Sequence, residues 1–298
     1  MKSNTMQSPV KGPPGPQISE AGNVMEAANA NIERMARSCP VCGINDSAYL
    51  AKLSRQGWDT VKCSECSMVY LSEAPRYESL VEDLAWTKQF GKEEKRRKKE
   101  QPLISWLDEK TRWRLHIARA NEWEYISRKC PSNGISVGRI LDVGCGSDCK
   151  IPEPFTPYGV EIDKKAVEAS DLLMRARGGH VVCAPAIDGI SEFDDDFFDG
   201  IIMRSYLEHE ADPRAVLKTS YKKLKPGGSI YVKVPNFGTL NRMVLGVNWC
   251  GFRFPDHLNY FDIKSLRHLA SLENFSFELI NKLSRLTNDN MHCFLTRQ

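Results

Sequence analysis

The chain is 298 residues long, which allows one sizeable domain and a smaller one, and its apolar content of 41% is that of an ordinary globular protein. A net charge of +3 is too small to indicate nucleic-acid binding by itself. No apolar run approaches the roughly 18 residues of a membrane span, and the start of the chain lacks the apolar segment of a secretory signal. We therefore expect a cytoplasmic protein without a membrane partner.

Residues 1–34 are rich in Pro, Gly, Ser and Asn, as in the stretch Lys11-Gly-Pro-Pro-Gly-Pro16. Such a composition buries too little apolar surface to offset the entropy lost on ordering, so we predict a disordered tail. The ten cysteines that follow, in a chain without a secretory signal, indicate reduced thiols and metal binding rather than disulfides.

Two C-x2-C pairs, separated by 20 residues, dominate residues 35–75. Each pair predicts a tight knuckle that aims two thiolates at one point, and two knuckles complete a tetrahedral four-sulfur site suited to a structural zinc ion. Iron in a rubredoxin-like site and free thiols are the alternatives. We expect strands at 49–53, 58–62 and 68–71, hence a zinc ribbon whose metal replaces a core of its own. The predicted ligands are Cys39, Cys42, Cys63 and Cys66.

Residues 76–130 have the pattern of a helical connector. Its mixed charge run at 93–100 is interpreted as a solvated helix face, with a phosphate-contacting patch as the alternative. Trp106, Trp113, Ile117 and Tyr125 recur at near-helical spacing, which is more typical of core packing than of base stacking. We expect this stripe to pack the connector against the sheet of the following domain.

From residue 131 to 298 the pattern alternates between strands and helices, which predicts an α/β domain with a Rossmann-like sheet covered by helices on both faces. The sequence predicts strands at 140–143, 158–161, 180–183, 197–203 and 229–234, and an edge hairpin from 276–281 and 291–296. Helices are expected at 164–177, 212–224 and 264–272.

The first of these strands runs into Gly144 and Gly146, which permit a tight turn and the close approach of a ligand. The second ends at Glu161, 19 residues after Asp142. In doubly wound sheets a carboxylate at this distance accepts hydrogen bonds from ribose hydroxyls. The pair therefore predicts a nucleoside pocket, with Glu161 as a helix cap as the alternative.

A dinucleotide needs a third glycine and a helix whose N-terminus faces pyrophosphate. Here the third glycine position is Cys149, and Pro152 and Pro154 interrupt any helix. These residues disfavour NAD and FAD and favour S-adenosylmethionine, which carries no phosphate.

Leu141-Asp-Val-Gly-Cys-Gly146 resembles motif I of the class I S-adenosylmethionine-dependent methyltransferases, and Gly159-Val-Glu161 resembles their acidic motif II. Further segments match in order and spacing, and the resemblance covers roughly residues 138–298. They are Phe198-Asp199, Leu207-Glu-His209, Asp212-Pro213, Leu224-Lys-Pro-Gly-Gly228, Val234-Pro-Asn236 and Asp256-His-Leu-Asn-Tyr-Phe261. A four-cysteine ribbon before such a domain is similar to bacterial small-molecule methyltransferases.

The resemblance implies an S-adenosylmethionine cofactor whose ribose hydroxyls meet Glu161. The cofactor-binding positions that it implies are Asp142, Gly144, Cys145, Gly146, Glu161, Ile162, Ile187, Asp188, Arg204 and Ser205. The chain departs from the pattern at Asp148, where the family commonly has a third glycine, and this predicts an irregular loop or weakened cofactor binding.

Leu207-Glu-His209 resembles the corresponding segment of metal-using relatives, the small-RNA and polyprenyl-catechol O-methyltransferases. Those have a further Glu where this chain has Ser205, so one ligand is missing. The missing ligand disfavours a catalytic metal ion, and we expect instead that Glu208 caps and His209 packs beside the cofactor.

Methyl transfer from a sulfonium is an in-line displacement with a good leaving group, so the protein mainly positions the reactants, and a hydroxyl or carbon acceptor also needs a base. His257 is the first candidate base, because an unperturbed histidine titrates near neutrality, and His209 and Tyr260 follow. We expect a small-molecule acceptor. The alternatives are an RNA or protein methyltransferase docked through the ribbon and basic run, a non-catalytic binding protein on the same fold, and an oxidoreductase.

Overall fold

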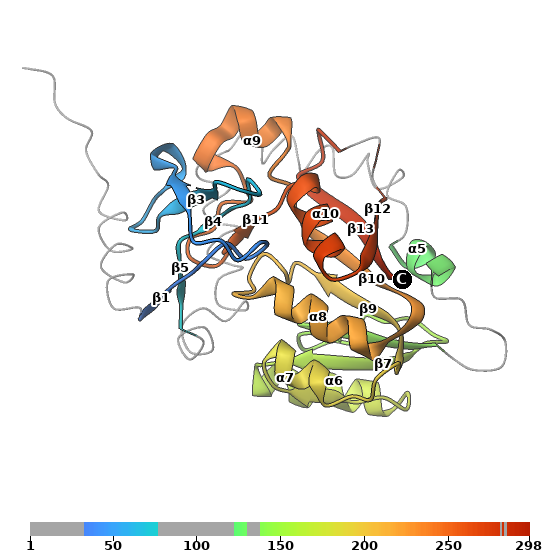
Figure 1. Cartoon of the computed structure of the whole chain (residues 1–298). Helices are drawn as coiled ribbons and strands as arrows, with labels where there is room; N and C mark the ends of the chain where they lie inside the picture. The colour runs from blue at the N-terminus through green and yellow to red at the C-terminus, as the bar shows by residue number, and fades with distance from the viewer. Residues whose placement is uncertain (1–32, 77–121, 130–137, 281, 283–284) are drawn as a thin grey trace, which may run out of the picture.

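The computed structural model describes residues 33–76, 122–129, 138–280, 282 and 285–298. The predicted tail, the charge run at 93–100 and the stripe from Trp106 to Ile117 lie outside the described residues. What the structure describes is a small cysteine-bearing unit beside a large α/β unit (Figure 1).

A seven-stranded sheet in the order β12-β13-β10-β9-β6-β7-β8 forms the centre of the α/β unit. Its strands are β6 (Arg139–Val143), β7 (Thr156–Glu161), β8 (Val181–Cys183), β9 (Phe198–Arg204), β10 (Leu224–Pro235), β12 (Phe275–Leu279) and β13 (Asn290–Arg297). The five strands from β6 to β10 are parallel, whereas β13 runs antiparallel to both β10 and β12. The switch in strand order falls between β6 and β9, where doubly wound sheets bind their ligands.

Helices cover both faces of this sheet because neighbouring strand residues point to opposite faces. Leu141 packs with Val216 and Leu266 on one face, and Ile140 packs with Ile126 on the other. The helices are α5 (Glu122–Lys129), α6 (Lys164–Arg175), α7 (Ala186–Ser191), α8 (Pro213–Lys223) and α10 (Ile263–Leu272). The predicted α/β fold is thus confirmed, and α5 shows that the last part of the predicted connector packs on the sheet.

The segment 147–155, between β6 and β7, forms no helix. Pro152 and Pro154 remove two backbone donors there, and the buried side chains of Ile151 and Phe155 pack over Ile140 instead. The two prolines, which were expected to interrupt a helix after the glycine turn, therefore leave no helix between β6 and β7.

One expected element differs from the structure, and one element was not expected. The strand expected at 49–53 is β2 (Ser47–Tyr49) followed by the 3-10 turn η1 (Ala51–Leu53). The last two strands form the expected hairpin at the edge of the sheet, with β12 outermost and β13 paired on its other side with β10. The helix α7 was not expected.

The cysteine-bearing unit is a four-stranded sheet with the order β11-β4-β3-β2, built from β3 (Thr60–Cys63), β4 (Val69–Leu71) and β2. Its outer strand β11 (Asn259–Tyr260) comes from the far end of the chain and pairs antiparallel with β4. A separate pair joins β1 (Arg34–Ala36) to β5 (Glu73–Pro75). The ribbon is therefore joined to the α/β unit by backbone pairing (Figure 1).

A second junction lies around α9 (Leu240–Leu245) and η3 (Gly246–Asn248). The segment after them brings the buried Trp249 and Phe252 against Trp58 and Leu71 of the ribbon in one apolar cluster. Because the ribbon shares this core, it does not depend on its own few apolar residues alone.

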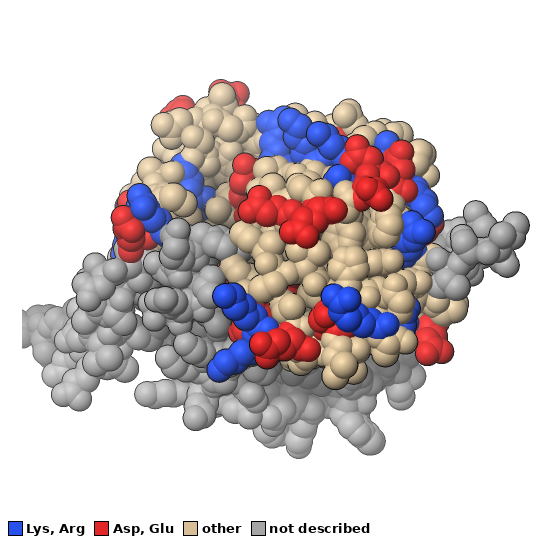
Figure 2. Space-filling model, turned by 90° about the horizontal axis from the view of Figure 1, so that it is seen from below, with Lys and Arg blue, Asp and Glu red and all other residues tan. Residues whose placement is uncertain are grey.

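On the face seen in Figure 2, Lys and Arg side chains stand beside Asp and Glu side chains, and neither sign forms a continuous patch. Among the described residues, every helix is too short or too polar to cross a membrane.

Candidate active site

The glycine turn after β6 has the backbone that its sequence predicts. Gly144 and Gly146 have φ values of 70° and 68°, in the left-handed region that favours glycine. The Gly144 amide donates to the Val160 carbonyl at 2.8 Å, which fixes the turn against β7. A Cβ at Gly146 would meet no atom within 4 Å, so the backbone there is open to an approaching group.

Glu161 at the end of β7 lies directly against this turn. Its carboxylate accepts the Gly146 amide at 2.8 Å and the amides of Ile162 and Asp163 at 2.8 and 3.1 Å. The cap of α6 is Asp163, which accepts from Lys165 and Ala166, so the alternative of Glu161 as that cap is wrong. Glu161 instead joins the tips of the two strands that frame the predicted nucleoside pocket.

Asp142 and Arg204 form an ion pair on the neighbouring strands β6 and β9, with Nη2 3.0 Å from Oδ2. Asp142 is fully buried, and burial raises the pKa of its carboxyl while Arg204 opposes that shift. Glu122 of α5 lies 3.8 Å from Arg204 and 3.1 Å from Lys233. Glu122 could not be predicted from the sequence, because nothing in its local pattern distinguishes it from any other charged residue of a helix.

The other predicted cofactor positions lie at the same edge of the sheet but differ in what they offer. The thiol of Cys145 is buried beside Met174 and Val181, so only its backbone faces the turn. Ile162 follows Glu161, and Ser205 follows β9 with a φ of 49°. Ile187 and Asp188 lie in the first turn of α7, and Ala184, two residues before that helix, donates its amide to the Glu161 carbonyl at 3.1 Å.

Two side chains of the turn after β9 converge with one side chain from a segment far downstream. Glu208, His209 and His257 each offer one ligand atom, and these atoms all lie within 4.8 Å of one another. We call them the acceptor cluster. Nδ1 of His209 lies 2.8 Å from the Asp256 carbonyl oxygen, and Nδ1 of His257 lies 2.8 Å from that of Gly251. Because each Nδ1 already faces a carbonyl oxygen, each histidine is left with Nε2 as the ring atom that can bind a ligand.

Burial and mutual charge set the protonation of this cluster. Burial raises the pKa of Glu208 to about 7. Burial alone lowers the pKa of His209, but the Asp256 charge outweighs it and raises that pKa to about 9. Burial and the neighbouring His209 hold the pKa of His257 well below its usual value. The Oε2 atom of Glu208 is buried and makes no hydrogen bond to the described residues.

The predicted bases therefore separate into two environments. His209 and His257 are neighbours, with ring centroids 4.7 Å apart. Tyr260 is buried among Phe252 and Phe254 in the apolar cluster shared with the ribbon, and burial raises the pKa of its phenol well above the usual value. The ring of Tyr260 packs against that of Phe252, with the centroids 4.6 Å apart.

The sequence model of a family described as a methyltransferase domain matches residues 107–281, more than half of the chain. The chain belongs to this family. The resemblance to S-adenosylmethionine-dependent methyltransferases and the predicted enzyme class are thereby confirmed at the level of the family.

Several relatives carry the name ubiquinone biosynthesis O-methyltransferase, among them those of Idiomarina loihiensis and Vibrio cholerae. The protein of Idiomarina loihiensis is 31% identical over 119 residues, which cover 38% of this chain and 46% of the relative. That of Vibrio cholerae is 28% identical over 135 residues, covering 44% and 52%. The chain thus spans about half the length of these relatives. A methyltransferase structure from Archaeoglobus fulgidus covers 65% of this chain and 100% of its own, at 16% identity and a TM-score of 0.46.

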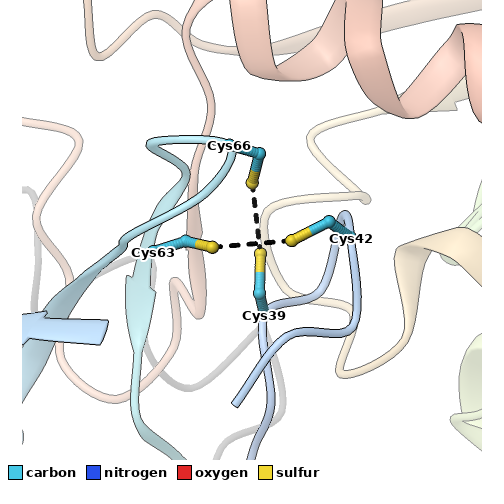
Figure 3. A group of neighbouring side chains, drawn as sticks. All are labelled: Cys39, Cys42, Cys63 and Cys66. Carbon is cyan, nitrogen blue, oxygen red and sulfur yellow. Dashed lines mark hydrogen bonds between the residues drawn. The ribbon is translucent and has the colours of Figure 1, made fainter. Parts of the chain in front are cut away.

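The ribbon of this methyltransferase-family chain brings its four cysteines to one point (Figure 3). Sγ of Cys39 lies 3.4 Å from that of Cys66, and Sγ of Cys42 lies 3.5 Å from that of Cys63. In a tetrahedral zinc site with bonds of about 2.3 Å the sulfur atoms lie about 3.8 Å apart. The four thiols therefore stand close to the spacing that a zinc ion needs.

Proposed function

We propose that this chain is an S-adenosylmethionine-dependent methyltransferase that acts on a hydroxyl group of a small aromatic molecule. Family membership supports the reaction, and the name of the two relatives supports an oxygen acceptor on a ring. The observation that carries the proposal is the acceptor cluster. It lies beyond the end of β9, the strand beside β6 and its glycine turn.

The cofactor end of the site fits S-adenosylmethionine. A carboxylate on β7 stands against an open glycine turn, as ribose hydroxyls require, and Oε2 of Glu161, which accepts the Gly146 amide, has a second acceptor site for a hydroxyl. Asp142 and Arg204 offer one negative and one positive group beside it, which match the ammonium and carboxylate of a methionine moiety. When bound, the cofactor supplies a methyl group on a positively charged sulfur.

The acceptor end fits a divalent cation. Three ligands of the carboxylate and imidazole type converge, and two of them, Glu208 and His257, are buried. Each histidine is oriented from behind by a protein oxygen, and one oxygen of Glu208 is left for a ligand. Such a cation lowers the pKa of a hydroxyl that it binds. The cation would be held by Glu208, His209 and His257. The metal-using relatives have one more protein ligand, a Glu at the position of Ser205.

The same residues allow a metal-free alternative. His257 stays neutral, so it is able to accept the acceptor proton, while the Asp256 charge keeps His209 protonated. This alternative keeps the predicted order of bases, with His257 first, and differs from the cation proposal only in whether turnover needs added metal.

We also propose that Cys39, Cys42, Cys63 and Cys66 hold a structural zinc ion. The closeness of their sulfur atoms supports this, and all four ligand positions come from the protein, which is the arrangement of a site without catalytic chemistry.

The test is methyl transfer from S-adenosylmethionine to 3,4-dihydroxybenzoate by protein dialysed in metal-free buffer, with and without Mg²⁺ or Mn²⁺. We expect turnover with added cation, and Glu208→Gln to reduce it about 100-fold. Glu210→Gln is the matched control, because Glu210 lies in the same turn but bonds the Tyr206 hydroxyl at 2.5 Å. Equal turnover without cation would select the metal-free alternative. No methylation of any hydroxyl acceptor under either condition would refute the proposed reaction.

A further inference from the structure

The segment that contains His257 is hydrogen-bonded both to the four-cysteine ribbon and to the α/β unit. Residues 256–261 follow the junction around α9 and contain β11. This strand pairs with β4, with Asn259 opposite Tyr70 and Tyr260 opposite Val69. The Leu71 amide of the ribbon also donates to the Leu258 carbonyl at 2.9 Å. The ribbon therefore fixes the backbone position of the residues that flank His257.

The same segment is fixed on its other side to the turn that carries Glu208 and His209. The amides of Leu258 and Asn259 both donate to the Glu208 carbonyl, at 2.7 and 3.0 Å. Nδ2 of Asn259 donates to the carbonyls of Leu207 and Glu210 at 2.8 and 2.7 Å. Because Asn259 is buried, these bonds are shielded from water and hold the two halves of the acceptor cluster in register.

Arg37 closes this arrangement from the ribbon, two residues before the first cysteine. Its Nη2 donates to the Asn259 side chain at 2.8 Å and to the Ala211 carbonyl at 2.9 Å, and its Nη1 lies 3.3 Å from the Leu258 carbonyl. The Arg37 guanidinium therefore contacts both the segment that contains His257 and the end of the turn that contains Glu208.

We propose that the four-cysteine ribbon positions the acceptor cluster, with Arg37 and Asn259 as the positioning residues that connect them. The inference rests on the proposed function. Filling of the cysteine site then controls the geometry of Glu208, His209 and His257. It does not control cofactor binding, because the glycine turn and Glu161 lie on β6 and β7 and make no bond to the ribbon among the described residues. A displacement of about 1 Å in such a site is enough to lower turnover about 100-fold.

Arg37→Ala tests the connection, and Arg34→Ala is its matched control. Arg34 is also a ribbon arginine, but its bonds go to Gly57 and Glu73 within the ribbon. In the full chain, we expect Arg37→Ala to lower turnover of 3,4-dihydroxybenzoate about 100-fold. We expect its dissociation constant for S-adenosylmethionine to stay within about twofold of wild type, and Arg34→Ala to leave turnover near wild type.

Amide hydrogen exchange provides a readout that does not depend on activity. We expect residues 256–261 to lose protection about tenfold or more in Arg37→Ala and in wild-type protein whose cysteine-bound metal has been removed. Residues 139–143 of β6 should keep theirs, which shows that the sheet stays folded. Unchanged protection of 256–261 in both samples would overturn the inference whatever the activity. Lost protection in a wild type that never turns over would uphold it while refuting the proposed reaction.

Discussion

Nδ1 of His209 lies 3.0 Å from Oδ1 of Asp256, a buried carboxylate that also lies 2.6 Å from Nη2 of Arg253. Burial by itself raises the pKa of Asp256, but the charge of His209 reverses the shift and holds that pKa below its usual range. The carboxylate therefore stays ionised, fixes the ring of His209 from behind and leaves Nε2 to the acceptor cluster. Such outer partners commonly change metal affinity or activity 10- to 100-fold.

Asp256→Asn should therefore lower turnover about 10- to 100-fold, because the amide keeps the shape of the side chain but removes its charge. Affinity for S-adenosylmethionine should not change. Asp262→Asn is the control: Asp262 caps α10 and makes no bond to the cluster among the described residues, so that variant should keep its turnover. Steady-state kinetics with both variants check this, and wild-type turnover in Asp256→Asn would contradict the role assigned to the carboxylate.

Local spacing was sufficient to predict the glycine turn and the four cysteines. Gly144 and Gly146 adopt the left-handed backbone that only glycine enters cheaply, and C-x2-C pairs form knuckles from neighbouring residues. Strands buried on both faces also have a strong pattern, which is why β6, β7 and β9 lie where they were expected.

Long-range pairing explains what was missed. β11 has two residues, too few for any periodicity, and exists because β4 offers it a partner far away in the chain. The position of Asp256 beside His257 was visible in the sequence, but its pairing with His209 depends on a turn that brings two loops together. Tyr260 resembles a candidate base by residue type alone, and only its burial among aromatic rings disfavours that role.

Removal of the Glu161 carboxylate should weaken cofactor binding. In Glu161→Ala the glycine turn loses the acceptor of the Gly146 amide, and the ribose loses its predicted carboxylate partner. We expect the dissociation constant for S-adenosylmethionine to rise about 10- to 100-fold, or about 1.4 to 2.7 kcal/mol. Isothermal titration calorimetry measures this. Asp163→Asn, which changes the neighbouring acid but keeps a helix cap, should bind nearly as wild type, and a wild-type constant in Glu161→Ala would remove that residue from the site.

The cysteine site should hold one zinc ion per chain, and Cys63→Ser should lose it. Three remaining thiolates bind zinc more weakly, and because the metal contributes directly to folding, the midpoint of thermal unfolding should fall by several degrees. Cys183→Ser changes an exposed cysteine outside the ribbon and should keep both zinc and midpoint. Elemental analysis of the purified proteins decides the matter. Iron in place of zinc would support the rubredoxin-like alternative, and full zinc in Cys63→Ser would exclude that cysteine as a ligand.

Asp171 should make the stability of the α/β unit depend on pH. Its carboxylate accepts the Val181 amide at 2.8 Å and Arg175 Nε at 2.5 Å, and so joins α6 to the start of β8. Its slight burial raises the pKa, but these two bonds outweigh that effect and lower it below the usual value. A lowered folded-state pKa stabilises the fold above the ordinary pKa, and this contribution is lost as the pH falls through the lowered value.

Asp171→Asn should therefore reduce the free energy of unfolding by about 1 kcal/mol at pH 7, since one charged hydrogen-bond acceptor becomes neutral. The difference from wild type should begin to shrink as the pH falls below about 4, where the carboxyl of the unfolded chain becomes protonated, and should be lost once the pH is below the lowered folded-state pKa. Urea denaturation at pH 7 and pH 3.5 measures both values. Glu168→Gln, on the exposed side of the same helix, should be neutral at both. A difference for Asp171→Asn that is equally large at the two pH values would show that side-chain shape, and not charge, holds α6 to β8.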